Sequence, residues 1–447
     1  MSVLAAALVC LAHPQQPADE LATYLLRGKP AVVTRTDVAL EMAFHLRRRE
    51  RGQQAAEHLV AAVLTRQIAV QKNLLPADKE VRAFWGELQD QLRAAGRRPE
   101  DVAAVRNTGE AQWLADLAVQ MAQERIVRAE LGLSAKETVT GDMLQLWLQE
   151  AKAKANVVTD ADQLPAGTAV RVGGADVPLI DLGMLLLRTA EDDERDKFVR
   201  QVAWLTTLEA LARDEGLQLT AEDLDASVQR RRDDAARDPR FRGITFENML
   251  QTQGLTVTTL RELRTFRAQI LLDKLAAARF PIEALAAELA ADRRAVSDRV
   301  GARRRIGLIF VRASDEPNGL IPRTFAEALQ HLEGVRERLG KETWENVARI
   351  ESEHASSKMQ GGDAGWHRRV SDRLPEPMLA AAWALPAGDV SMPLRNEEGC
   401  FLVKVLEVEP EPADAVLLSR LREWKAQDLS QRLLTDAKIE FVGGAKK

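Results

Sequence analysis

The spacing of apolar residues changes near residue 303 of this 447-residue chain, and that change limits the folds open to it. Before it, apolar residues recur every three or four positions, as over residues 59–68, which predicts amphipathic helices with few breaks. After it, residues 306–311 and 401–408 are short apolar runs typical of buried strands. The chain is therefore predicted to be α+β, with a mostly helical region followed by a compact domain of strands and helices.

Apolar residues at helical spacing also occur between these two strands and after the second one. It predicts a helix over residues 324–339 and another that starts near Thr343, both between the strands. A long helix is predicted over residues 415–434, and residues 439–442 read as a closing strand. Because a whole domain separates the last helix from the first ones, we expect it to pack back on the N-terminal helices.

The helical region contains two similar segments. Residues 31–38 match residues 175–182 at an offset of 144, and each segment is a short extended stretch followed by an Asp that could cap a helix. Asn73 and Gly216 are separated by 143 positions and both fall where a helix would end. We interpret this as an internal duplication; the alternative is coincidence between two amphipathic helices.

Composition shifts and turn-rich stretches predict the domain boundaries. Residues 160–174 hold several Gly, Pro and Asp residues and separate the two similar segments. The predicted parts are a signal peptide (1–12), a first helical module (20–135), a helix and linker (136–167), a second helical module (168–300), the α+β domain (303–409), and a C-terminal helix and strand (410–447).

The first twelve residues predict export. Residues 3–12 are apolar for the length of a signal-peptide core, and Cys10 and Ala12 place small residues before a cleavage site. A basic n-region is missing, so a buried N-terminal helix is the alternative reading. A lipid anchor on Cys10 is less favoured, because Val9 stands where a small residue is wanted. No later stretch is apolar enough to predict a transmembrane helix in the mature chain.

Charge and residue spacing argue against several functions. The formal net charge is −5 with both signs mixed along the chain, so no nucleic-acid-binding surface is predicted. The six histidines are scattered, and no His/Cys cluster has the spacing of metal ligands. The glycine pair at 361–362 lacks the context of a phosphate-binding loop. We therefore expect no metal and no cofactor.

The α+β part carries a set of motifs in a fixed order. Residues 361–366 read GGDAGW and resemble the GGDLGW signature of the parvulin-type (PpiC, or rotamase) peptidyl-prolyl isomerases. Residues 385–393 look like the family's L-x-x-G-E-V-S-x-P, and residues 399–404 fall where it has G-Y-H-I-I-K. Residues 344–348 match its second helix. Glycine pairs alone mark any tight turn, but these elements in order indicate a parvulin fold.

The rest of the chain resembles, more loosely, the helical modules that flank parvulin domains in SurA-like and PrsA-like proteins. That resemblance implies a periplasmic or otherwise exported chaperone whose partners are unfolded or nascent exported polypeptides and proline-containing segments. It also implies rotation about X–Pro amides, whose barrier is about 18–20 kcal/mol. Such a site needs no nucleophile; it must bind the twisted amide better than the planar one.

The chain departs from the family at its polar site positions. The family's first-strand His aligns with Leu308, its Asp or Cys with Ala355, and its last-strand His with Phe401. No catalytic residue is therefore assigned. His354 and His367 are possible substitutes, although two exposed loop histidines are the simpler reading. Apolar replacements leave no buried polar group unpaired, so the fold should survive.

Other family positions carry over more directly. The residues expected to contact substrate are Ala364, Trp366, His367, Leu374, Met378 and Phe401. The residues expected to hold the structural motif are Gly361, Gly362, Asp363, Gly365, Gly388 and Ser391.

Three functions remain open at this point. The leading hypothesis is an exported chaperone whose parvulin domain holds polypeptides with weak or absent isomerase activity. The alternative is an active peptidyl-prolyl isomerase with a relaxed site. The second alternative is an envelope-assembly subunit with one fixed partner. The trio Leu308, Ala355 and Phe401 favours the first.

Overall fold

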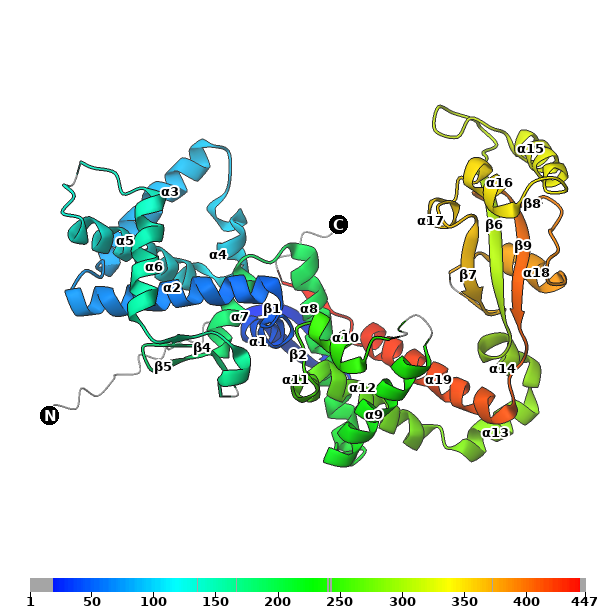
Figure 1. Ribbon diagram of the computed structural model, residues 1–447, viewed down its shortest axis with the longest axis horizontal. Helices are drawn as coiled ribbons and strands as arrows, with labels where there is room; N and C mark the ends of the chain where they lie inside the picture. Colours follow the sequence, from blue (N-terminus) through cyan, green and yellow to red (C-terminus); the bar gives the residue numbers. More distant parts are fainter. Residues whose placement is uncertain are drawn as a thin grey trace. The chain divides into compact units, whose positions relative to one another are not determined.

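The computed structural model describes residues 19–134, 136–165, 167–238, 241, 243–371 and 373–442 (Figure 1). The predicted signal peptide lies outside these residues. The chain forms two compact units, one of Met1–Leu272 with Ser430–Lys447 and one of Asp273–Leu429. The predicted α+β class, mostly helical with one smaller mixed domain, is confirmed.

The first unit is mainly helical. Its strands are β1 (Glu20–Leu26), β2 (Lys29–Thr34), β3 (Val157–Val158), β4 (Thr168–Val172), β5 (Ala175–Pro178) and β10 (Glu440–Phe441). Its α-helices are α1 (Arg35–Leu46), α2 (Glu50–Lys72), α3 (Asp78–Ala94), α4 (Ala103–Thr108), α5 (Glu110–Glu130), α6 (Gly141–Lys154), α7 (Leu179–Arg188), α8 (Asp192–Asp214), α9 (Ala221–Arg237), α10 (Phe246–Thr252) and α11 (Val257–Glu262), with the start of α12 (Arg264–Arg279) and the end of α19 (Asp414–Asp436). Short 3₁₀ turns cover Pro99–Asp101 and Ala161–Gln163.

The two similar segments fold alike. In each, a β-hairpin leads into a short helix and then a long one: β1–β2–α1–α2 and β4–β5–α7–α8. Asn73 ends α2 in the left-handed conformation, as predicted. The predicted Asp caps are wrong in detail. Thr34 is the N-cap of α1, and Asp37 completes a capping box three residues later, because its carboxylate accepts from the Thr34 N–H at 3.0 Å.

The two copies exchange their packing partners. The short helix α1 packs on α7 and α8, and α2 packs on α7. Ala39 and Gly183, which are equivalent at the offset of 144, lie at the crossing of α1 and α7, where a Cβ on Gly183 would be 2.1 Å from the Ala39 carbonyl oxygen. The copies therefore share one apolar core rather than forming two separate ones.

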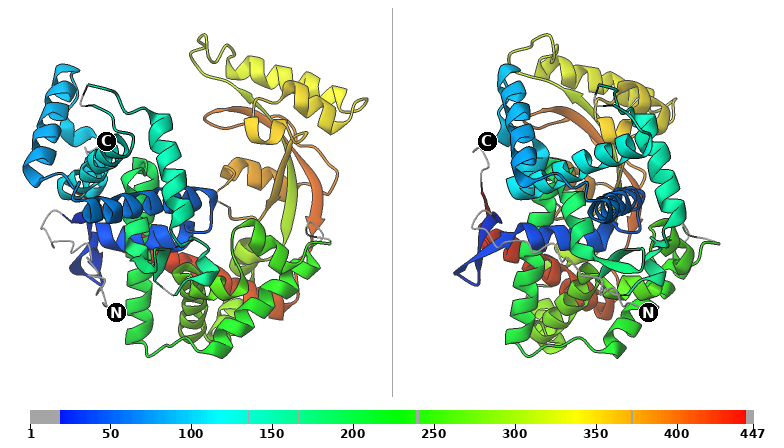
Figure 2. Two further views of the ribbon diagram at one scale, coloured as in Figure 1. Left: turned by 60° about the vertical axis from the view of Figure 1, so that its left-hand side comes forward. Right: turned by 90° about the vertical axis from the view of Figure 1, so that its left-hand side faces the viewer.

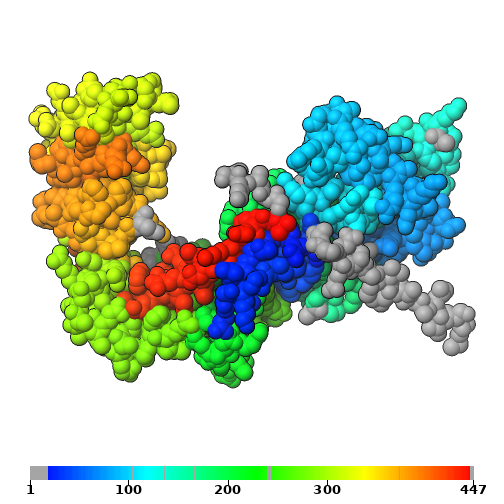
Figure 3. Space-filling view, turned by 180° about the vertical axis from the view of Figure 1, so that it is seen from behind, coloured from blue at the N-terminus to red at the C-terminus, as the bar shows by residue number. Residues whose placement is uncertain are grey.

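The C-terminal residues complete this unit. β10 pairs antiparallel with β1, with Ala22 opposite Phe441. Figure 3 shows the red C-terminal segment beside the blue N-terminal hairpin. The guanidinium of Arg200 lies over the Phe441 ring, 5.1 Å from its centre. The predicted closing strand is thus confirmed.

The second unit is built around one antiparallel sheet of order β7-β6-β9-β8. Its strands are β6 (Arg303–Arg312), β7 (Asp363–His367), β8 (Leu394–Arg395) and β9 (Gly399–Glu409). Its helices are α13 (Ile282–Ala291), α14 (Arg293–Val300), α15 (Phe325–Arg338), α16 (Trp344–Glu351), α17 (Ala355–Lys358) and α18 (Glu376–Ala384), with the end of α12 and most of α19.

Successive residues of β6 and β9 point to opposite faces of this sheet. Ile309, Val311 and Leu402 face α15 and α16 in one apolar cluster. Leu308, Phe310, Phe401 and Val403 face α18 in another. Figure 2 shows α15 and α16 on one side of the long strands and α18 on the other. The strands and helices predicted here from residue 303 onward are confirmed.

The remaining helices of the second unit form their own small core. α13 and α14 contribute Leu285, Leu289, Val296 and Val300, which pack against Leu417 and Leu421 of α19. Residues 273–300 therefore lie in this unit, while the domain boundaries drawn from the sequence stay predictions. Among the described residues, no helix combines the length and apolar character needed to cross a bilayer.

Candidate functional site

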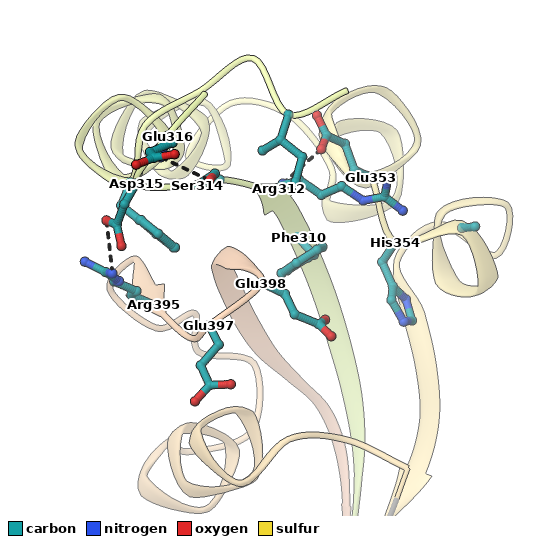
Figure 4. Close-up of a pocket in the computed structure, with 14 residues that line it drawn as sticks. Phe310, Arg312, Ser314, Asp315, Glu316, Glu353, His354, Arg395, Glu397 and Glu398 are labelled. Atoms are coloured by element: carbon teal, nitrogen blue, oxygen red, sulfur yellow. Dashed lines mark hydrogen bonds and ion pairs between the residues drawn. The ribbon is translucent and has the colours of Figure 1, made fainter. Parts of the chain in front are cut away.

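A pocket of about 850 Å³ opens at one end of the sheet in the second unit (Figure 4). Three chain segments that are far apart in the sequence surround it: the loop after β6, the residues just before α17, and the turn that joins β8 to β9. The antiparallel pairing of β6 with β9, which sets Val311 opposite Cys400, brings the first and third segments together.

Apolar residues form the smaller part of the pocket's lining, which we call its floor. Phe310 from β6, Phe325 from α15 and Ile321 from the intervening loop all line it, and both phenyl rings are 7% exposed. The backbone around Phe310 is tied to the second segment. Its N–H donates to Ser352 Oγ at 3.2 Å, and its carbonyl accepts from the Glu353 N–H at 2.7 Å. These bonds fix Glu353 and His354 beside the strand.

Charged side chains form the mouth of the pocket. Arg312, Asp315 and Glu316 come from the loop side, and Arg395, Glu397 and Glu398 from the turn side. Figure 4 shows Asp315 facing Arg395, a pair 3.5 Å apart, with Glu397 and Glu398 on the adjoining turn. Glu353 accepts from Arg323 at 2.5 Å and from the Arg312 N–H at 2.9 Å.

His354 is the histidine that lines this pocket. Its Nδ1 lies 2.8 Å from Ser357 Oγ, and Ser356 Oγ is 3.4 Å away. Burial lowers the pKa of His354 from its ordinary value, which favours the neutral imidazole. The Ser356 hydroxyl is also 3.4 Å from Nε2, so both ring nitrogens lie near a serine hydroxyl.

The structure separates the three residues predicted to align with the family's polar positions. Leu308 and Phe401 are both 0% exposed and belong to the apolar cluster under α18. Ala355 is exposed, begins α17 and lines the pocket beside His354. Of the residues singled out from the sequence, only His354 and Ala355 therefore line this pocket.

None of the predicted substrate contacts lines the pocket. Leu374 and Met378 are buried in the same cluster as Phe401, with Ala364 at its edge. Trp366 is half-buried, with the Arg303 guanidinium 5.4 Å from its ring centre. His367 is buried, and its Nε2 lies 2.9 Å from the Ala364 carbonyl oxygen. His367 thus has a partner within its own strand.

The predicted motif residues shape the backbone. Gly361, Gly362, Gly365 and Gly388 all have positive φ, and Asp363 accepts from Arg305 at 2.6 Å and from the Gly365 N–H at 2.8 Å. Ser391 Oγ accepts from the Val403 N–H at 2.9 Å, which ties the segment before β8 to β9. These contacts are those of a structural turn.

Sequence reasoning missed most of the pocket. The apolar spacing places Phe310 only in a strand, and no motif marks the acidic pairs at 315–316 and 397–398. A usable signal existed, since both acidic pairs flank the facing ends of two predicted strands. Cys400 is buried, with Sγ 3.7 Å from the Phe325 carbonyl oxygen, and burial raises the pKa of its thiol. It is therefore a small core residue rather than a reactive one.

The residues that the structure describes contain no group of three or more His, Cys, Asp or Glu side chains placed to hold a metal ion. The pocket combines an apolar floor, a neutral imidazole and a charged mouth. Such a pocket can hold a short polypeptide segment through apolar and charge contacts.

Residues 309–407 match the family described as "Rotamase: PPIC-type PPIASE domain". The chain is 28% identical over 236 residues to the chaperone SurA of Alkalilimnicola ehrlichii, covering 51% of this chain and 52% of that one. It is 27% identical over 131 residues to the chaperone SurA of Xylella fastidiosa, covering 29% and 28%. The chain thus spans about half the length of the first relative and just over a quarter of the second.

Among solved structures, the peptidylprolyl isomerase PrsA of Bacillus anthracis aligns at 17% identity with a TM-score of 0.26, covering 52% of this chain and 94% of that one. The motif order, the sheet with its flanking helices and the family match agree over the same residues. The chain therefore contains a parvulin-type domain of the PPIC class, set in a polypeptide similar to the SurA chaperones.

Proposed function

We propose that this protein is an exported folding chaperone that binds unfolded polypeptides, and that its parvulin domain holds client segments with little isomerase activity. The observation that carries the proposal is the complete burial of Leu308 and Phe401 at two positions where the family has histidines. A buried leucine and phenylalanine offer no hydrogen bond to a twisting amide, so the transition state gains little over the ground state.

The pocket supports a holding role. Phe310, Phe325 and Ile321 give a floor on which an apolar or prolyl side chain can lose its water shell. An export location is proposed from the SurA-like resemblance and from the apolar segment at residues 3–12.

A second groove, in the first unit, supports client binding away from the parvulin domain. It has a volume of about 500 Å³ and lies between α2, α5 and α7. Its lining includes Val63, Trp113, Leu117 and Met184. Apolar walls suit an unfolded polypeptide, which brings apolar side chains that lose their water shell there.

The holding role is tested by exchange NMR on short X–Pro peptides mixed with the full chain. We expect peptide signals to shift or broaden while the cis–trans exchange rate stays near its uncatalysed value. Strong acceleration at substoichiometric protein would contradict the proposal and favour an active isomerase, with His354 as the polar group. That second function is favoured by one observation, the place of the His354 imidazole in the lining of the pocket.

The chaperone role is tested by light scattering of a chemically unfolded protein diluted into buffer with the full chain. Val63→Glu, in the groove, should weaken suppression of aggregation, because it places a carboxylate on an apolar wall. Val70→Glu is the matched control: Val70 lies on the same helix, is 59% exposed and is outside the groove. Equal suppression by the two variants, with unchanged circular dichroism, would remove the groove from the proposal.

A further inference from the structure

The mouth of the parvulin-domain pocket carries more negative than positive charge. Its acidic side chains are Asp315, Glu316, Glu353, Glu397 and Glu398, and its basic ones are Arg312 and Arg395. They come from three segments of the chain, and Figure 4 shows them gathered around Phe310. Excess negative charge lowers the electrostatic potential over the concave floor, and this raises the local concentration of cationic groups there.

Part of this charge is already neutralised. Glu353 is paired with Arg323, and Asp315 lies 3.5 Å from Arg395, whose guanidinium also covers the Phe325 ring at 3.6 Å. Glu316, Glu397 and Glu398 form no ion pair with any residue in the described part of the chain. These three carboxylates exceed the single remaining cation, Arg312. The mouth is therefore short of positive charge, and a bound segment can supply it.

Resting on the proposed function, we propose that this pocket selects client segments in which a lysine or arginine lies next to a prolyl or other apolar residue. The apolar residue sits against Phe310 and Ile321, beside the Phe325 ring that the Arg395 guanidinium covers. The cationic head reaches Glu397 and Glu398 on the turn before β9, while its methylene stem crosses the apolar floor. A segment with Asp or Glu at that place meets like charges and is rejected.

The selectivity depends on ionic strength. Glu397 and Glu398 are exposed, so their attraction for a cation is screened as salt is added, with a Debye length of about 10 Å at 0.1 M and about 3 Å at 1 M. The apolar contribution of the floor does not weaken with salt in this way. High salt should therefore remove the difference between peptides and leave the binding itself.

The test uses the full chain and three fluorescent peptides that differ only in the residue before proline, which is Lys, Gln or Glu. We expect the Lys peptide to bind about fivefold more tightly than the Gln peptide at low salt, and the Glu peptide to bind most weakly. The double variant Glu397→Gln/Glu398→Gln should bring the three affinities together. The control is Glu333→Gln/Glu337→Gln, which neutralises two exposed carboxylates of α15 outside the pocket and should preserve the order.

The outcomes separate the two proposals. Equal binding of the three peptides to the parent protein overturns the charge selectivity and leaves the holding role intact. A preference for Lys that persists in Glu397→Gln/Glu398→Gln also overturns it, because the selectivity then arises elsewhere. Failure of all three peptides to bind at low and high salt overturns the holding role of this pocket together with its selectivity.

Discussion

The indole nitrogen of Trp344 lies against the backbone of Gly362. A Cβ built on Gly362 would be 2.7 Å from Trp344 Nε1 and 2.7 Å from the Ala348 Cβ, closer than carbon and nitrogen atoms approach in proteins. The same indole faces Gly307, where a Cβ would be 2.8 Å away. The first turn of α16 thus packs directly on two glycine backbones, one in β6 and one in the glycine turn.

We predict that Gly362→Ala destabilises the parvulin domain by about 3 kcal/mol or more, because overpacking adds to the strain of a positive φ. The matched control is Gly388→Ala. Gly388 also has positive φ (+91°) but has no heavy atom within 4 Å of a built Cβ, so it should cost only about 1–2 kcal/mol. Urea unfolding of the full chain, with proteolysis to follow each unit, measures both. Equal losses would show that the Trp344 contact is easily relieved.

A second close approach joins the two copies in the first unit. Gly183→Ala places a methyl group 2.1 Å from the Ala39 carbonyl oxygen, so α1 and α7 must separate. We expect a loss of about 3 kcal/mol or more in the stability of this unit. Gly86→Ala, in α3 with open space around it, should instead stabilise by up to about 1 kcal/mol. A small effect of Gly183→Ala in thermal unfolding would mean that the crossing is loosely packed.

The buried carboxylate of Glu41 makes the first unit sensitive to pH. It is 4% exposed, accepts from Gln201 at 2.8 Å and lies 3.5 Å from the Arg264 guanidinium. Burial raises the pKa of Glu41 above the ordinary value of 4.5, although Gln201 and Arg264 oppose the shift. A raised pKa means that folding disfavours the charged form. The free energy of unfolding therefore rises as the pH falls through the pKa of folded Glu41.

Glu41→Gln removes this titration. We predict that the variant is at least as stable as the parent at pH 8, with a gain of up to about 2 kcal/mol in the free energy of unfolding. This difference should shrink as the pH approaches 4.5. Glu209→Gln is the control, since Glu209 accepts from Arg264 at 2.8 and 3.1 Å and its loss should cost about 1 kcal/mol at pH 8. Urea titrations at both pH values decide the matter, and similar losses in both variants at pH 8 would refute the buried-charge penalty.

The sequence predicted those features that local physics dictates. The strands and helices of the parvulin domain follow from apolar spacing, and the glycine turn follows because only glycine adopts φ of +67° and +85° at Gly361 and Gly362 without strain. The helix end at Asn73 follows from its tolerance of the left-handed conformation.

Features set by long-range packing could not be predicted in the same way. Spacing shows that α1 and α2 are amphipathic, but not that α1 packs on a helix of the other copy. Likewise, Asp315, Glu353 and Glu397 lie far apart in the sequence and meet only because of the sheet order β7-β6-β9-β8. Exposed charges follow no periodic pattern, so their gathering around one pocket leaves no mark in any single segment.

The last prediction concerns isomerase chemistry. Leu308→His with Phe401→His and Ala355→Asp places polar groups at the three positions that the sequence resemblance aligns with the family's polar residues. The first two lie on the face of β6 and β9 that meets α18. If a client proline binds against this face, donors at these positions should raise the exchange rate of an X–Pro peptide about tenfold or more over the parent. Each buried imidazole lacks a built partner, so a stability loss of about 1–3 kcal/mol per histidine is expected.

Phe401→Leu is the control for this variant, because it alters the same buried site without adding a polar group. The gain should be larger above pH 6.5, where an ordinary imidazole is neutral, than below it, where protonation of a buried histidine opposes folding. Exchange NMR on the full chain measures the rate, and circular dichroism checks the fold. If a folded triple variant is no faster than the parent, the polar positions do not limit catalysis here, because the closed apolar cluster under α18 keeps the peptide bond away from them.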